Sequence, residues 1–112
     1  MNKNLWIEES DRYTERAKEF HNERFFGNKD QIDTSNRLFK IISNYVPEPM
    51  NILDIGCAYG GLINELKNVY KKAFFLGIDP GRKTIEIANN NVQSKRVSFI
   101  RGFSDNLSIE DD

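Results

Sequence analysis

The spacing of apolar residues changes once along the chain, near residue 48. Before that point apolar positions recur every three or four residues, which is the period of an amphipathic helix. This spacing predicts one helix over residues 10–26 and a second that starts at Asp33 or Thr34 and ends before Pro47. The inward face of the second helix should consist of Leu38, Ile41, Ile42 and Tyr45. Residues 1–48 are therefore expected to form a helical cap.

Beyond residue 48, short apolar runs of strand length alternate with segments of helical spacing. Strands are predicted at 51–55, 73–79 and 96–101, and helices at 61–70 and 83–90. Strands that alternate with single helices form a parallel sheet through right-handed crossovers. Residues 49–112 are thus predicted to form a βαβαβ unit of the α/β class, packed with the cap into one compact unit.

Composition and charge narrow the possible classes of protein. The chain has 112 residues, enough for one small domain. Its 16 Lys and Arg nearly balance 17 Asp and Glu, so there is no strong nucleic-acid signature and no basic patch for an anionic membrane. No stretch approaches the roughly 18 apolar residues of a membrane-spanning helix, and the start does not resemble a signal peptide. With one cysteine and one histidine, Cys57 and His21, neither a disulfide nor a metal site is expected, and the expected location is the cytoplasm.

A glycine-rich turn follows the first predicted strand, and an acidic residue ends the second. The turn, Asp54-Ile55-Gly56-Cys57-Ala58-Tyr59-Gly60-Gly61, lies at the carboxyl end of a parallel strand, where α/β sheets bind ligands. Glycine lets the main chain turn sharply and lets a ligand approach it closely. Asp79 lies 23 residues after Gly56, near the offset of about 20 residues at which an acid binds ribose hydroxyls. This order of elements predicts a mononucleotide-binding half-fold.

The charge beside the turn distinguishes between nucleotide cofactors. Ala58 stands where the dinucleotide motif G-x-G-x-x-G has its second glycine. A pyrophosphate prefers the positive start of a helix, and the Asp54 carboxylate would repel it. The ammonium and sulfonium groups of S-adenosylmethionine would be attracted instead. These residues therefore favour S-adenosylmethionine over NAD and disfavour a nicotinamide-dependent oxidoreductase.

Three segments, in order, resemble the class I S-adenosylmethionine-dependent methyltransferases. Residues 51–60, Asn-Ile-Leu-Asp-Ile-Gly-Cys-Ala-Tyr-Gly, are similar to the first motif of that family. Residues 76–80, Leu-Gly-Ile-Asp-Pro, resemble the second motif, and residues 97–107 resemble the third strand with the loop that covers adenine. The resemblance implies a Rossmann-like three-layer α/β sandwich with parallel strands and helices on both faces. It also implies that residues 49–112 are the first half, three strands, of a seven-stranded sheet.

The resemblance further implies a role for each matching residue and S-adenosyl-L-methionine as the cofactor. The implied cofactor-binding residues are Asp54, Gly56, Cys57, Ala58, Gly60, Asp79, Pro80, Phe103 and Ser104. Asp54 would hold the methionyl ammonium, the glycine loop would face the methionine and ribose, and Asp79 would accept the ribose hydroxyls. Pro80 would lie near the adenine, which Phe103 and Ser104 would flank. The implied activity is methyl transfer to an unidentified acceptor, with catalytic residues located after residue 112.

The sequence departs from the family pattern in ways that affect these expectations. Ala58 replaces a glycine, and Phe103 stands where an acid often contacts the adenine amino group. The first strand is central in the family, but here nothing would pair with its outer edge. We therefore expect either a homodimer or a C-terminal half to cover that edge.

The same residues also have purely structural interpretations. Asp54 could cap the following turn, and Asp79 could cap the next helix with Pro80 at its first position. Cys57 is expected to fill space in the loop rather than act as a nucleophile, because no histidine is near it in the sequence. A non-catalytic nucleotide-fold module that acts by assembling with another subunit is the alternative to a methyltransferase.

Overall fold

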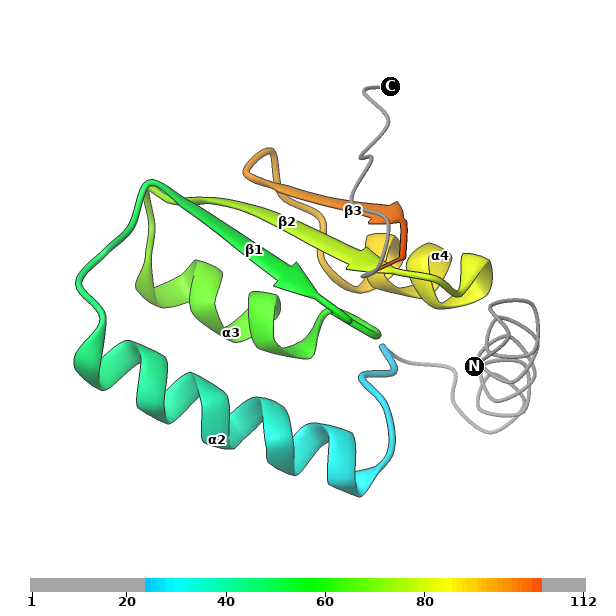
Figure 1. The fold of residues 1–112 in the computed structure, drawn as a ribbon, viewed down its shortest axis with the longest axis horizontal. Helices are drawn as coiled ribbons and strands as arrows, with labels where there is room; N and C mark the ends of the chain where they lie inside the picture. Colours follow the sequence, from blue (N-terminus) through cyan, green and yellow to red (C-terminus); the bar gives the residue numbers. More distant parts are fainter. Residues whose placement is uncertain (1–23, 104–112) are drawn as a thin grey trace.

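A computed structural model describes residues 24–103, which form a parallel sheet of three strands with helices packed against it (Figure 1). The elements are α2 (Lys29–Tyr45), β1 (Asn51–Ile55), α3 (Gly61–Val69), β2 (Phe74–Asp79), α4 (Arg82–Asn91) and β3 (Val97–Arg101). Every strand and helix predicted after residue 48 is present, with ends that differ by at most one residue. The helix predicted over residues 10–26 lies largely outside the described residues, and residues 24–26 are not helical.

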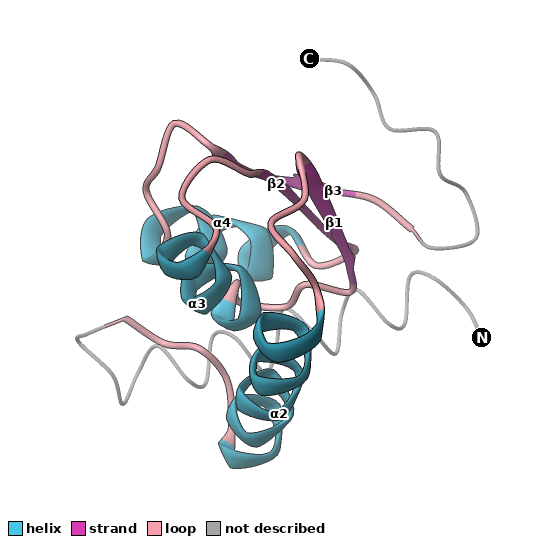
Figure 2. Ribbon diagram, turned by 90° about the vertical axis from the view of Figure 1, so that its left-hand side faces the viewer, coloured by secondary structure: helices cyan, strands magenta, loops and turns pink. Residues whose placement is uncertain are grey.

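The strands lie in the order β1-β2-β3, with Phe75 of β2 opposite Ile52 on one side and Val97 on the other. Both connections step in the same direction, so crossovers of one hand place α3 and α4 on the same face of the sheet (Figure 2). The predicted parallel α/β architecture is confirmed. Helices on the second face, which we also expected, are not found among residues 24–103.

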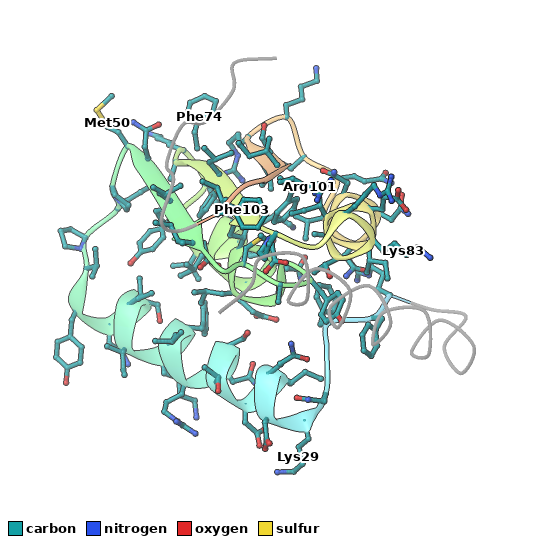
Figure 3. All side chains as sticks on the ribbon, turned by 45° about the vertical axis from the view of Figure 1, so that its right-hand side comes forward. Lys29, Met50, Phe74, Lys83, Arg101 and Phe103 are labelled. Carbon is teal, nitrogen blue, oxygen red and sulfur yellow. The ribbon has the colours of Figure 1, made fainter. Side chains whose placement is uncertain are left out.

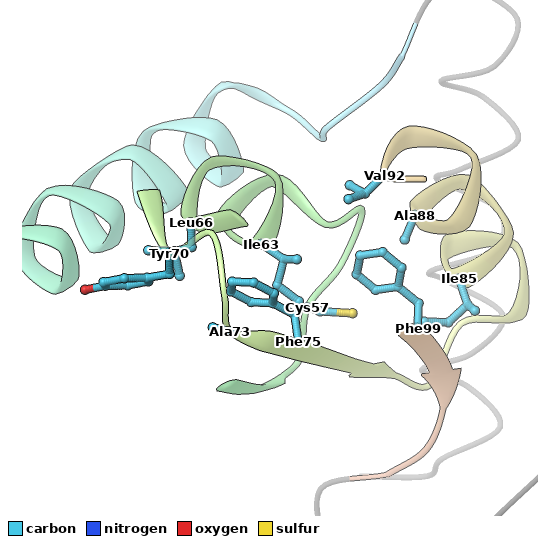
Figure 4. Close-up of a cluster of buried hydrophobic side chains, with 10 residues drawn as sticks. All are labelled: Cys57, Ile63, Leu66, Tyr70, Ala73, Phe75, Ile85, Ala88, Val92 and Phe99. Atoms are coloured by element: carbon cyan, nitrogen blue, oxygen red, sulfur yellow. The ribbon is translucent and has the colours of Figure 1, made fainter. Parts of the chain in front are cut away.

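The core fills the space between the sheet and these two helices (Figure 4). It contains Cys57, Ile63, Leu66, Tyr70, Ala73, Phe75, Ile85, Ala88, Val92 and Phe99. The helical spacing of the apolar residues predicts that Leu62, Leu66 and Val69 of α3, and Ile85 and Ala88 of α4, face inward. Leu66, Ile85 and Ala88 are buried, but Val69 is 45% exposed, so its predicted inward position is wrong. Ile63, which is fully buried, was not among the residues predicted to face inward.

The opposite face of the sheet carries exposed apolar side chains, which no other part of residues 24–103 covers. Leu53, Ile55 and Phe74 are 49%, 44% and 58% exposed. The apolar run that contains Phe74 and Phe75 predicts a core position for both, which is wrong for Phe74, because successive strand residues point to opposite faces and Phe75 faces the helices. Figure 3 shows Phe74 and Met50 near each other, at the end of the sheet where β1 and β2 begin.

Helix α2 begins earlier than predicted. Asn28 caps it: its side chain accepts from the Gln31 amide at 2.8 Å, and the Gln31 side chain accepts from the Asn28 amide at 2.8 Å. The predicted starts at Asp33 and Thr34 are therefore wrong.

The inward face of α2 also differs from the prediction. Phe39 and Ile42 pack against the core, whereas the other three residues predicted to face inward, Leu38, Ile41 and Tyr45, are 41%, 52% and 82% exposed. The Tyr70 hydroxyl at the end of α3 donates to the carbonyl oxygens of Ile42 and Val46, which fixes the far end of α2. In the part of the chain that is described, no helix is long and apolar enough to cross a membrane.

Candidate functional site

A cleft of about 390 Å³ lies between the first half of α2 and the glycine loop that follows β1. Its volume is in the range of small-molecule sites. The loop side is lined by Asp54, Gly56, Cys57, Ala58, Tyr59, Gly61 and Leu62. The α2 side is lined by Phe26, Asn28, Asp30, Gln31, Thr34, Ser35 and Leu38. The structure therefore brings four of the predicted residues, Asp54, Gly56, Cys57 and Ala58, into one concave surface.

The glycine loop is a compact turn held by its own backbone. Gly56, Ala58 and Gly60 have φ of +76°, +49° and +84°, the left-handed region that favours glycine. The amides of Gly56 and Cys57 donate to the Ile78 carbonyl at 2.7 and 3.0 Å, and the Gly60 amide donates to the Cys57 carbonyl at 3.0 Å. The loop is thus tied to the end of β2, and Ala58 bears the strain of a side chain at positive φ.

Two glycines of this loop serve different purposes. A Cβ on Gly60 would lie 2.8 Å from Cζ of Phe99, so this position must be glycine for the loop to pack on the core. A Cβ on Gly56 would meet no atom within 4 Å. Gly56 lines the cleft, so its bare Cα leaves room there for a ligand.

Asp54 gives the cleft its charge. Burial, and to a smaller extent the nearby Asp79 carboxylate, raise the pKa of the Asp54 carboxyl from 3.8 to about 6. Asp54 is therefore mostly ionised at neutral pH, in a place where water solvates it poorly. Asp30 also lines the cleft, and no Lys or Arg occurs among its described lining residues. The site favours a cation.

Asp79 lies at the end of β2, behind the loop rather than in the lining of the cleft. Its Oδ1 accepts from the Ala58 amide at 3.2 Å and its Oδ2 accepts from the Gly81 amide at 3.1 Å. The carboxylate therefore links the glycine loop to the turn that precedes α4. The N-cap of α4 is Gly81. The purely structural interpretation of Asp79, as the cap of this helix, is therefore wrong.

Cys57 is a space-filling residue of the loop. It is 5% exposed, and its Sγ donates to the Ala58 carbonyl at 3.7 Å. Burial, together with the Asp79 and Asp54 carboxylates, raises the pKa of the thiol far above its ordinary range. The thiol therefore stays protonated at neutral pH, which argues against a nucleophile.

The remaining predicted residues lie outside the lining of this cleft. Gly60 and Pro80 are buried, and Phe103 is half-buried after β3. Ser104 lies outside the described residues. The contribution of α2 to the cleft was not predicted. The sequence feature that could have indicated it is the capping box of Asn28 and Gln31, which marks the start of α2 beside the cleft.

Comparisons with known proteins agree with this geometry. Residues 52–112 match the family model described as a methyltransferase domain. The chain is 35% identical over 71 residues to a malonyl-[acyl-carrier protein] O-methyltransferase of Priestia megaterium, covering 63% of this chain and 26% of that protein. The chain therefore spans about a quarter of the length of this curated relative.

Solved structures support the fold. A chain of the complex between the Haloferax volcanii Trm112 methyltransferase activator and a methyltransferase has a TM-score of 0.69 at 20% identity, covering 93% of this chain and 43% of that one. A SAM-dependent methyltransferase of Geobacter sulfurreducens, in complex with S-adenosyl-L-homocysteine, has a TM-score of 0.53 at 18% identity. That match covers 84% of this chain and 36% of the other.

Proposed function

Because the chain belongs to the methyltransferase domain family, whose cofactor is S-adenosylmethionine, we propose that its cleft binds the amino-acid end of that cofactor for methyl transfer to an unidentified acceptor. The observation that carries this proposal is the pairing of a poorly solvated carboxylate, Asp54, with an unobstructed glycine, Gly56. The carboxylate suits the ammonium group, and the bare Cα admits the ligand. When bound, S-adenosylmethionine supplies a methyl group already activated by its sulfonium.

The residues of this chain would bind and orient the cofactor rather than take part in the chemistry. Asp54 would hold the ammonium group, and the surface of Gly56, Cys57, Ala58 and Gly60 would face the methionine and ribose. Asp79, whose Oδ1 and Oδ2 accept from the amides of Ala58 and Gly81, would also accept the ribose hydroxyls. Pro80, Phe103 and Ser104 would surround the adenine. We divide the chain into a cap, residues 1–48, and a cofactor-binding unit, residues 49–112.

A calorimetric titration with S-adenosylhomocysteine, with NAD as control, tests the proposal. The first should bind in the micromolar range and the second should not. Replacing Gly56 with alanine should weaken S-adenosylhomocysteine binding at least about 10-fold, because the new methyl group enters the cleft. The same change should lower the free energy of unfolding by only about 1 kcal/mol, the cost of positive φ.

Ala58→Gly is the matched control for that substitution. It removes a methyl group from a positive-φ position in the same loop, so it relieves strain and should not lower the free energy of unfolding, in contrast to Gly56→Ala. Binding by the Gly56→Ala variant as tight as that of the original chain would show that the cleft is not the cofactor site.

Binding of S-adenosylhomocysteine should also depend on pH. The ammonium of the ligand needs the ionised Asp54 carboxylate, whose pKa is about 6. The dissociation constant is therefore expected to rise about 10-fold between pH 7.5 and pH 5, as Asp54 becomes protonated. Titrations at half-unit pH intervals measure the midpoint, which should lie near pH 6.

Asp54→Asn assigns this pH dependence. The variant should bind weakly at every pH, with no midpoint near 6. If S-adenosylhomocysteine binding by the variant still changed with a midpoint near pH 6, the titrating group would not be Asp54.

The same substitution should also change the stability of the fold. The pKa of Asp54 is higher in the folded chain than its ordinary 3.8, so ionisation destabilises the fold as pH rises through about 6. The variant should therefore melt at a higher temperature than the original chain at pH 7.5, and without that gain at pH 4.

The exposed face and free edge of the sheet are proposed to bind a further polypeptide. Within residues 24–103, β1 is an edge strand, and Leu53, Ile55 and Phe74 form an apolar face that no described element covers. Either a C-terminal half or a second copy of the chain would supply the cover. Light scattering separates the two, because only the second gives twice the mass of the chain.

We propose the cytoplasm as the location of the protein, because the Cys57 thiol remains reduced there.

A further inference from the structure

Asn91 is a buried polar residue that lies outside the lining of the cleft. It is the last residue of α4 and is 5% exposed. Its Nδ2 donates to the Phe25 carbonyl at 2.6 Å and to the Tyr59 carbonyl at 3.0 Å. One amide group thus joins three parts of the chain: the segment before α2, the glycine loop and the end of α4.

The bond to Tyr59 fixes one peptide of the glycine loop. The carbonyl of Tyr59 and the amide of Gly60 belong to the same planar peptide. Asn91 holds the carbonyl, and the Gly60 amide donates to the Cys57 carbonyl at 3.0 Å. With both polar groups held, the peptide has one orientation, and this sets the left-handed turn at Gly60. Gly61 and Leu62, which follow that turn, line the cleft.

The bond to Phe25 fixes the entry of the chain into the opposite wall. The Phe25 ring contacts the Tyr59 ring edge-on, with centroids 4.8 Å apart. Arg24 Nη1 donates to the Asn91 carbonyl at 3.3 Å, and Phe26, the next residue, lines the cleft. The same asparagine therefore connects the segment that leads into the α2 wall with the loop that forms the other wall.

We propose that Asn91 is a positioning residue of the cofactor site: its side-chain amide holds the glycine loop against the segment that leads into α2, and so shapes the cleft. The consequence for cofactor binding rests on the proposed function, whereas the effect on the loop does not. Asparagine suits this position because both hydrogens of its amide are used. An aspartate would set a carboxylate against two carbonyl oxygens.

The test compares Asn91→Ala and the milder Asn91→Ser with Tyr70→Phe. Tyr70 is a matched control because it too is buried and donates to backbone carbonyls of the α2 region, but at the end of α2 far from the cleft. Two quantities are measured on each 112-residue variant: hydrogen exchange of the Gly60 amide by NMR, and the affinity for S-adenosylhomocysteine by calorimetry.

In Asn91→Ala, exchange of the Gly60 amide should accelerate, and the affinity for S-adenosylhomocysteine should fall, each about 10-fold, as expected for losing a buried hydrogen bond. Asn91→Ser should lie between that variant and the original chain, and Tyr70→Phe should change neither quantity by more than about 2-fold. Unchanged Gly60 exchange in a folded Asn91 variant, or equal acceleration in Tyr70→Phe, would overturn the inference. Failure of the original chain to bind S-adenosylhomocysteine would instead overturn the proposed function.

Discussion

Replacing Gly77 with alanine is expected to lower the free energy of unfolding by about 3 kcal/mol, a large part of the stability of a small domain. Gly77 lies in the central strand β2, where an added Cβ would be 2.6 Å from Cδ1 of Phe99 and 2.9 Å from Sγ of Cys57. Both neighbours are buried in the core, so neither can move away without displacing others. Urea unfolding followed by circular dichroism measures the loss.

Phe99→Leu provides the control for the steric argument at Gly77. The smaller side chain removes the ring atoms that the new Cβ would strike, at the cost of some packing. The double variant Gly77→Ala/Phe99→Leu should then be more stable than the sum of the two single losses predicts, by at least about 1 kcal/mol. Strict additivity would show that the loss at Gly77 comes from some other source.

The second large effect is expected at Arg96, which precedes β3. Its guanidinium donates to the carbonyls of Tyr70, Ala73 and Lys67 at 2.8, 2.9 and 3.0 Å. These oxygens belong to the end of α3 and the turn after it, where carbonyls lack helical partners and the helix dipole is negative. Arg96→Met should therefore lower the free energy of unfolding by about 3 kcal/mol, measured by urea unfolding.

Arg101→Met is the matched control for Arg96. Arg101 is exposed and makes one bond of this kind, from Nε to the Pro80 carbonyl at 3.2 Å. Its replacement should change stability by no more than about 0.5 kcal/mol. Equal losses in the two variants would indicate a general effect of removing positive charge rather than capping of α3.

The sheet and the glycine loop could be predicted from the sequence because their signals are local. The strands are short apolar runs in the sequence, and β1 is present at the predicted bounds, residues 51–55, although each of its residues is exposed or half-buried among the described residues. The loop could be found in the same way, because Gly56 and Gly60 occupy the left-handed region that glycine adopts most easily.

Contacts between distant residues could not be predicted in this way. The charged pair Lys95-Arg96 predicts a solvated turn, which is wrong for Arg96, because its guanidinium donates to carbonyls 23 to 29 residues away in the sequence. Asn91 reaches Phe25 across 66 residues, and nothing in its surroundings in the sequence marks it. The face that α2 buries was also misjudged, since it depends on where α3 packs and not on the helix pattern alone.

The reactivity of the Cys57 thiol can be used to measure local opening of the core beside the glycine loop. Cys57 is the only cysteine of the chain, and its side chain extends from the glycine loop into the core, between the rings of Phe75 and Phe99 (Figure 4). Because its thiol is buried and protonated, a thiol reagent reacts only when this part of the core opens. The labelling rate therefore measures how often the part of the core beneath the glycine loop opens, and no residue has to be replaced to make the measurement. A ligand that keeps the loop closed slows that labelling as it saturates the chain.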